Sequence, residues 1–133
     1  MIRGMADSDV AILRQIHETN GLPENCFPDL ADPLFLVKNV VEQDGKPVMA
    51  SFLKGTSEIF LIVDHSQGTP EERWAWLCEL KEVMVHEAWL RGLSEMTAWI
   101  PPEIEKGFAK RLEGLGFCPS AWRSYTLRIP DQM

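Results

Sequence analysis

The apolar residues change their period twice within the segment 58–100, which reads EIFLIVDHSQGTPEERWAWLCELKEVMVHEAWLRGLSEMTAWI. Five consecutive apolar residues at 59–63 predict a strand over 58–64 that is buried on both faces. Apolar residues then recur at helical spacing over 69–91, and the segment 94–100 predicts a second strand. Because a strand, a long helix and a strand follow one another, the two strands are expected to run parallel, with the helix as their crossover.

Upstream of this unit, the chain is predicted to begin with a short strand and a helix. Ile2-Arg3 is a short apolar start, and the N-cap cluster Asp7-Ser8-Asp9 precedes helical spacing over about 8–19. Asn20-Gly21 ends this helix, because glycine suits the left-handed position after a C-terminus. The proline-containing residues 21–33 predict a loop with room for one helical turn.

The region between the first helix and residue 64 predicts three antiparallel strands. Leu34–Val41 is an apolar run, Asp44-Gly45 is typical of a two-residue hairpin turn, and Pro47–Leu53 is the expected partner strand. Residues 54–57 are expected to turn the chain again, into the strand 58–64. Since each strand follows the previous one through a short turn, we expect a three-stranded meander.

Downstream of residue 100, the sequence predicts one more helix and one more strand. Apolar residues line one face of a short helix that Gly116 ends, namely Ile104, Phe108, Leu112 and Leu115. Trp122–Ile129 alternates well enough to form a last strand. The predicted order is β-α-β-β-β-α-β-α-β, and the length of 133 residues fits a single domain over 1–133.

Charge and composition restrict the class of protein. The net charge of −7 argues against a nucleic-acid partner, which selects for a basic surface. The acidic excess lies in residues 1–100, which carry 16 acidic and 8 basic side chains, against 4 and 5 in residues 101–133. An acidic body would attract a cationic substrate such as an amine, although solubility explains the charge equally well.

Neither a membrane anchor nor a secretion signal is expected. The longest aliphatic and aromatic run, 59–63, is far shorter than the roughly 20 residues that cross a bilayer. Acidic residues occupy the start of the chain, where a signal peptide needs its apolar segment. Cys26, Cys78 and Cys118 form no CxxC pair, which is typical of free thiols in a reducing compartment. We therefore expect a cytoplasmic protein without a membrane partner.

The element order, the opening Ile2-Arg3…Asp9 and the segment 108–117, which reads FAKRLEGLGF, resemble the GNAT N-acetyltransferase superfamily. The resemblance implies an α/β (α+β-like) fold, the GNAT-like acyl-CoA N-acyltransferase fold, in which a mixed, mostly antiparallel sheet is flanked by helices. It also implies that the strands 58–64 and 94–100 splay apart and that acetyl-CoA or another acyl-CoA enters the gap. The implied activity moves the acyl group to the amine of a small molecule or a protein.

The loop before the long helix departs from the family's phosphate-binding pattern, Q/R-x-x-G-x-G/A. The resemblance implies cofactor binding at Val63, Gln67, Gly68 and Thr69, and Gln67 fits the first position of the pattern. However, Pro70 and Glu72 replace the small residues, and Pro70 has no N–H to offer a phosphate. Thr69-x-x-Glu72 is also typical of a capping box, with Pro70 at the first helical position. The loop is thus either a structural helix cap or a phosphate cradle, and its chemistry favours the cap.

The candidate catalytic residue is His65, which follows Asp64 at the mouth of the expected gap. Its alternative explanation is a solvated loop histidine. Many family members carry a tyrosine four residues before the glycine of the "GF" ending, where this chain has Leu112, an expected core residue. The only tyrosine, Tyr125, cannot be given that role. His86-Glu87 lacks the second histidine of a zinc-protease motif, so no metal site is expected.

Two functional hypotheses follow, an N-acyltransferase with an altered phosphate loop and a degenerate GNAT-fold protein that acts as a binding or structural module. Direct attack by a neutral amine needs mainly positioning and an oxyanion contact, so the missing tyrosine does not exclude the first hypothesis. Trp74, Trp76 and Trp89 do not share one face of the long helix, so at least one should be partly exposed. Ordinary surface apolarity and a partner or homodimer contact both explain such exposure.

Overall fold

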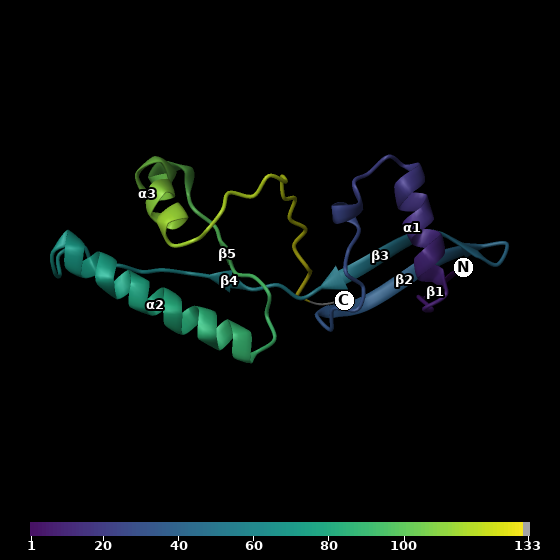
Figure 1. Cartoon of the computed structure of the whole chain (residues 1–133), viewed down its shortest axis with the longest axis horizontal. Helices are drawn as coiled ribbons and strands as arrows, with labels where there is room; N and C mark the ends of the chain where they lie inside the picture. Colours follow the sequence, from purple (N-terminus) through teal and green to yellow (C-terminus); the bar gives the residue numbers. More distant parts are fainter. Residues whose placement is uncertain (132–133) are drawn as a thin grey trace.

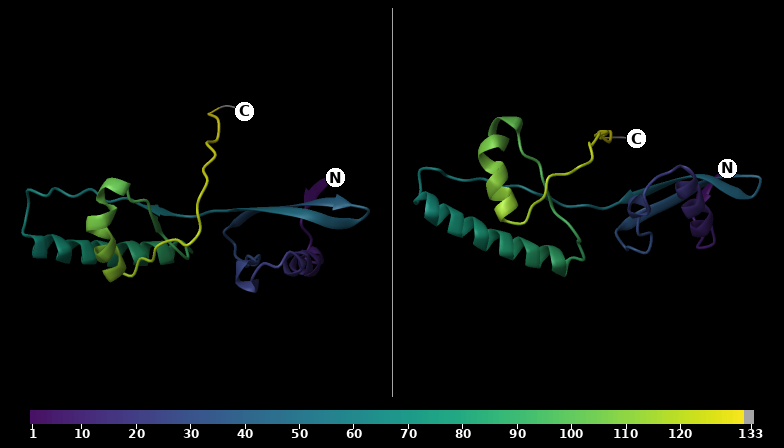
Figure 2. Two further views of the ribbon diagram at one scale, coloured as in Figure 1. Left: turned by 90° about the horizontal axis from the view of Figure 1, so that it is seen from above. Right: turned by 45° about the horizontal axis from the view of Figure 1, so that its top comes forward.

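The computed structural model describes residues 1–131 and shows a mixed α/β chain (Figure 1). Over these residues the elements are β1 (Ile2–Gly4), α1 (Asp9–Thr19), the 3-10 turn η1 (Glu24–Cys26), β2 (Phe35–Gln43), β3 (Lys46–Lys54), β4 (Glu58–Ile59), α2 (Pro70–Leu90), β5 (Thr97–Ala98) and α3 (Pro102–Gly114). They form two halves that lie end to end, an N-terminal half (residues 1–56) and a C-terminal half (residues 57–131) (Figure 2).

The N-terminal half is an antiparallel sheet with the strand order β1-β2-β3, and α1 packs against one of its faces (Figure 2). The predicted hairpin is confirmed, because Asp44 and Gly45 both have positive φ, at 52° and 78°, as a two-residue turn requires. Val40 at the centre of β2 is only 1% exposed, and Leu13 of α1 is also buried. The core of this half therefore lies between the sheet and α1.

The start of α1 differs from the predicted N-cap cluster. Ser8 occupies the cap position without a side-chain hydrogen bond, and the helix begins at Asp9. The Asp9 carboxylate accepts hydrogen bonds from the Arg3 guanidinium, at 2.7 and 3.0 Å, and from the Ala6 N–H at 2.8 Å. These hydrogen bonds lower the pKa of Asp9 to about 2, and those from Arg3 have the largest effect. Asp9 thus ties α1 to β1 instead of capping the helix.

The C-terminal half confirms the parallel sense of the predicted crossover, but the strands expected over 58–64 and 94–100 are only Glu58–Ile59 and Thr97–Ala98. Two residue pairs join β4 to β5, Glu58 with Thr97 and Ile59 with Ala98, and the two strands run parallel. The helix α2 connects them and runs alongside the chain that precedes it (Figure 2). Gly92, with φ of +73°, ends α2 in the left-handed conformation that favours glycine.

The predicted meander is wrong in its third strand. The sheet of the N-terminal half takes its third strand from β1, whereas β4 pairs with β5 in a separate two-stranded sheet. Residues 54–57 do not reverse the chain, which runs on from β3 through β4 (Figure 1). The expected burial of 58–64 on both faces is also wrong, since Phe60 is 79% exposed and Ile62 is 98% exposed.

The predicted last strand is absent from the part of the chain that the structure describes. Residues 122–129 form no strand and leave the body of the C-terminal half (Figure 2), and Tyr125 is 90% exposed. The order observed over residues 1–131 is β-α-β-β-β-α-β-α, divided between two sheets instead of the one mixed sheet expected. A strand needs a neighbour to hydrogen-bond with, and alternation in sequence cannot supply one. None of the helices in residues 1–131 combines the length and apolarity needed to cross a bilayer.

Candidate functional site

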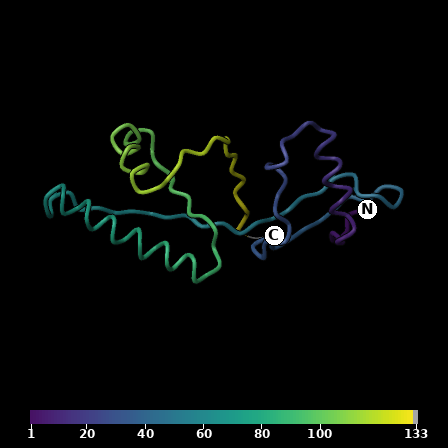
Figure 3. Tube along the Cα trace, in the orientation of Figure 1, coloured from purple at the N-terminus to yellow at the C-terminus, as the bar shows by residue number. Residues whose placement is uncertain are grey.

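A pocket of about 770 Å³ lies in the C-terminal half, within the size range of small-molecule sites. Its walls come from residues 61–65, from the first half of α2 and from α3. The trace in Figure 3 shows how the chain 60–67 and α2 run side by side, with α3 near the start of α2. The pocket is therefore built between the chain 61–65, the helix α2 that follows it, and α3, which is distant in sequence.

The parallel strand pair places this pocket. The strands β4 and β5 pair through two residues each, and the Trp99 Nε1–H donates to the Glu58 carboxylate at 3.1 Å. The chain after β4 and the chain after β5 then separate (Figures 1 and 3). The separated chain 61–65 forms a wall of the pocket. Within the described residues 1–131, residues 60–63 form no backbone–backbone hydrogen bond, so N–H groups of this wall are open to a ligand.

The apolar lining comes mainly from the two helices, through Trp74, Trp76, Leu77 and Leu80 of α2 and Phe108 of α3. Gly114 of α3 lies against the Trp74 ring of α2, since a Cβ atom at Gly114 would be in ordinary contact with it, at 3.7 Å. The Trp76 ring lies over Gly68, where a Cβ atom would approach it to 2.5 Å. Glycine is required at position 68 for this contact and for its φ of +69°. As predicted, Trp74, Trp76 and Trp89 are exposed.

The loop before α2 ends in the predicted capping box. The Thr69 hydroxyl accepts a hydrogen bond from the Glu72 N–H at 3.1 Å, and the Glu72 carboxylate accepts one from the Thr69 N–H at 3.2 Å. Pro70 is the first helical residue and has no N–H. The side chains of Thr69 and Glu72 thus occupy two of the N–H groups that a phosphate would use.

The remainder of the loop is closed by Arg73. Its Nη1 donates hydrogen bonds to the carbonyl oxygens of Gln67 at 3.0 Å, Gly68 at 2.7 Å and His65 at 3.4 Å. The N–H groups of Ser66 and Gln67 both donate to Asp64, to its carboxylate and its carbonyl oxygen respectively. The loop therefore directs carbonyl oxygens toward a cation and uses the N–H groups of Ser66, Gln67, Thr69 and Glu72 internally, which is the reverse of a phosphate cradle.

Charged side chains surround the apolar lining. Arg73, Lys110 and Arg111 line the pocket together with the carboxylates of Asp64 and Glu71. Hydrogen bonds from the side chain and the N–H of Ser66 lower the pKa of Asp64, so this carboxylate stays ionised near neutral pH. The lining therefore offers basic side chains to an anionic group and carboxylates to a cationic group.

The residues predicted from the sequence lie together, but in two roles. Val63, His65 and Gln67 line the pocket. Gly68 and Thr69 do not line it and instead shape the loop, through the contact with Trp76 and the capping box. The His65 side chain is exposed, so it can exchange protons with the solvent and with a ligand.

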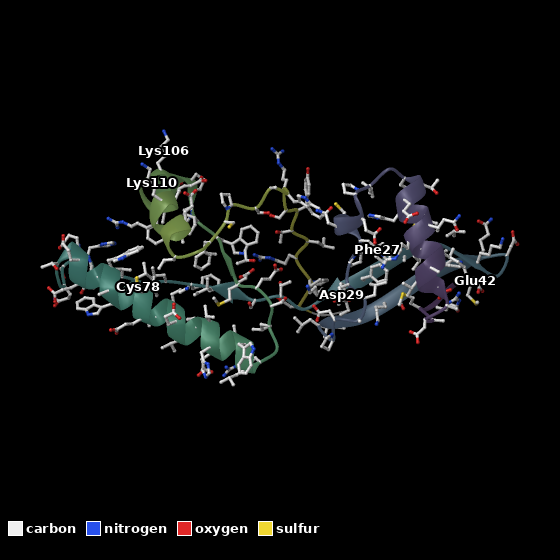
Figure 4. All side chains as sticks on the ribbon, viewed as in Figure 1. Phe27, Asp29, Glu42, Cys78, Lys106 and Lys110 are labelled. Carbon is white, nitrogen blue, oxygen red and sulfur yellow. The ribbon has the colours of Figure 1, made fainter. Side chains whose placement is uncertain are left out.

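Sequence reasoning missed the part of the lining that comes from the helices. Arg73 lies one helical turn after the cap residue Thr69, a spacing that allows its side chain to reach back to the loop. Lys110-Arg111 is the only pair of adjacent basic residues in the chain, and both line the pocket. Figure 4 shows Lys106 and Lys110 on α3, of which only Lys110 lines the pocket. These two signals were available in the sequence.

No family model, curated protein or solved structure matches the chain. Among residues 1–131, no three His, Cys, Asp or Glu side chains gather in a way that could hold a metal ion. The site is thus defined by its geometry, a partly apolar pocket at the point where a parallel strand pair separates.

Proposed function

We propose that this chain is a GNAT-like N-acyltransferase that binds acetyl-CoA or another acyl-CoA and moves the acyl group to an amine. The observation that carries the proposal is the parallel pair β4–β5, which separates after two residue pairs and has the pocket against the separated chain 61–65. The resemblance to GNAT N-acetyltransferases implies a cofactor at this place. The pocket also has the mixed character that acyl-CoA requires, apolar walls beside cationic side chains.

Different residues of the site suit different parts of acyl-CoA. The apolar walls around Trp76 and Phe108 suit the acyl and pantetheine groups. Lys110 and Arg111 suit the phosphates, because the capping box already uses the N–H groups of Thr69 and Glu72. Phosphate recognition therefore shifts from the backbone of the loop to the side chains of α3.

The chemistry on the protein side needs an oxyanion contact and a proton acceptor. Acyl-CoA supplies a thioester carbonyl that is open to attack by an amine. An N–H group of residues 61–63 that faces the pocket is able to donate to an oxyanion, as preorganised donors do in acyl-transfer sites. The carboxylates of Asp64 and Glu71 attract a cationic amine, and His65 takes its proton so that it can attack.

A second candidate is a GNAT-fold binding module without catalysis. The capping box of Thr69 and Glu72, together with the closure of the loop by Arg73, favours it. Such a protein would hold its ligand in the same pocket but would not release a thiol.

Thiol release from acetyl-CoA and longer acyl-CoAs, measured with a panel of amines, tests the choice. The acyltransferase should release thiol above background, and His65→Gln should lower kcat by about 100-fold, the lower end for a general base. His86→Gln is the matched control, because His86 lies on α2 outside the pocket and stacks on Trp89. Binding without thiol release would favour the binding module, and neither binding nor release would contradict the acyltransferase.

A further inference from the structure

Each half of the chain carries an apolar surface that nothing covers in residues 1–131. In the N-terminal half, α1 covers one face of the sheet and the other face is open (Figure 2). Val37 and Leu53 are opposite each other on this open face, Met49 lies further along β3, and Met49 and Leu53 are 67% and 59% exposed. In the C-terminal half, residues 60–63 and much of α2 are exposed and apolar.

The total exposed area shows how much surface is left to cover. The chain exposes 11195 Å², whereas a compact monomer of 15.1 kDa exposes about 7,100 Å². The excess of about 4,000 Å² is on the scale of the 2,000–5,000 Å² that obligate homodimers bury. An area of this size indicates that a large apolar interface is missing from the isolated chain.

The two surfaces also match in their backbone. The strand β3 is nine residues long and lies at an open edge of its sheet. Residues 60–63 continue from β4 and form no backbone–backbone hydrogen bond. The turn expected from the sequence over 54–57 would pair these two segments antiparallel. The hinge between them, residues 54–57, is extended, so the two segments run on in line and point away from each other on either side of the hinge (Figure 1).

We propose that a second copy of this chain supplies the missing partner by exchange. Residues 58–63 of each copy pair antiparallel with β3 of the other copy, and α2 of each copy covers the open sheet face of the other. Because each chain offers both an open β3 edge and an unpaired strand, one twofold arrangement satisfies both surfaces at once. The exchange also orders residues 61–63, a wall of the pocket, so the ligand site is complete only in the pair.

The hinge residue Gly55 provides the first test. Its φ is not positive and a Cβ atom would meet only ordinary contacts at 3.8 Å, so Gly55→Val keeps the extended hinge. Light scattering should give twice the chain mass of 15.1 kDa for the wild type and for Gly55→Val. Inserting three Gly-Ser pairs after Gly55 lets the chain fold back on itself, so this variant should become monomeric. A monomeric wild type would overturn the proposal.

Mixed chains give the second test. They carry serine in place of Cys26, Cys78 and Cys118, and light scattering must first show that this triple variant has the same mass in solution as the wild type. One chain carries Met49→Cys, and a second chain with a different tag carries Ile62→Cys. A turn over 54–57 would place these positions opposite each other, within disulfide reach. After the chains are unfolded and refolded together, a disulfide should join them.

The control pairs Met49→Cys with Leu61→Cys, whose side chain lies on the opposite face of the strand. It should give far less of the mixed disulfide. No mixed disulfide with Ile62→Cys, or equal amounts with Leu61→Cys, would contradict the exchange. Neither test requires acyl-CoA, so their results decide on the exchange independently of the proposed function.

Discussion

The guanidinium Nη1 of Arg73 lies 2.7 Å from the carbonyl oxygen of Gly68, so the first turn of α2 closes the loop that precedes it. The same guanidinium also binds the carbonyl of Gln67. One cation thus holds the backbone that leads from the pocket wall into the helix. Carbonyl oxygens that face a cation do not suit a phosphate, so the phosphate contacts in our proposal come from side chains.

Arg73→Ala should loosen this loop. Without the cation, the carbonyl oxygens of Gln67 and Gly68 repel one another and turn toward solvent, because nothing else in the loop donates to them. Amide hydrogen exchange of residues 66–68 should therefore become faster, while exchange in the sheet of the N-terminal half stays unchanged. Equal protection of residues 66–68 in both proteins would show that Arg73 does not hold the loop.

Thr69→Ala should lower the free energy of unfolding by about 1 kcal/mol, because an N-cap hydrogen bond is lost. Glu72→Gln should cost less, since its amide oxygen can still accept from the Thr69 N–H. Thr126→Ala is the control, because Thr126 is exposed and lies outside the elements. Urea denaturation of the three variants checks this order, and a loss for Glu72→Gln as large as for Thr69→Ala would contradict it.

Glu71→Gln should raise the affinity for acetyl-CoA. Glu71 lines the pocket and takes no part in the capping box, so the change removes a negative charge without disturbing the start of α2. For an exposed charge, the expected gain is about 2- to 5-fold, and it should shrink as salt is added. Glu79→Gln, on α2 but outside the pocket, is the matched control. A gain that is independent of salt would speak against an electrostatic cause.

Acid should destabilise the chain through Asp9. Its pKa is lowered to about 2, below its usual value of 3.8, so its ionised form is favoured in the folded state. The contribution of Asp9 to stability is complete above pH 4 and is lost as the pH falls through the folded pKa toward 2. Asp9→Asn should be less stable than the wild type at pH 7, and this difference should narrow between pH 4 and pH 2. Denaturation midpoints at these pH values test the prediction, and a constant difference would refute it.

The sequence predicted those features that one or two residues determine locally. Asp44-Gly45 determines its turn because both residues adopt positive φ, and Thr69 with Pro70 determines where α2 begins. The partner of 58–64 was not predictable in this way. An apolar run indicates that a strand needs cover but does not tell which segment supplies it, and the third place in the sheet went to β1.

The candidate site shows the same division between local and distant effects. His65 was predicted from its place after the strand 58–64, and Val63 and Gln67 from the resemblance to the GNAT superfamily; all three line the pocket. Phe108 and Lys110 line it because α3 approaches the start of α2, a contact between segments distant in sequence. Helical spacing places both residues on α3 but does not tell what that helix packs against.

Calorimetric titration of acetyl-CoA tests most directly whether the pocket between residues 61–65, α2 and α3 binds acyl-CoA. The wild type should bind one acetyl-CoA per chain, and the double variant Lys110→Ala with Arg111→Ala should bind about tenfold more weakly at low salt. Lys106→Ala, which removes a charge from α3 outside the pocket, should bind as the wild type does. No binding of acetyl-CoA or longer acyl-CoAs at millimolar concentration, or equal binding by the double variant, would contradict the proposal.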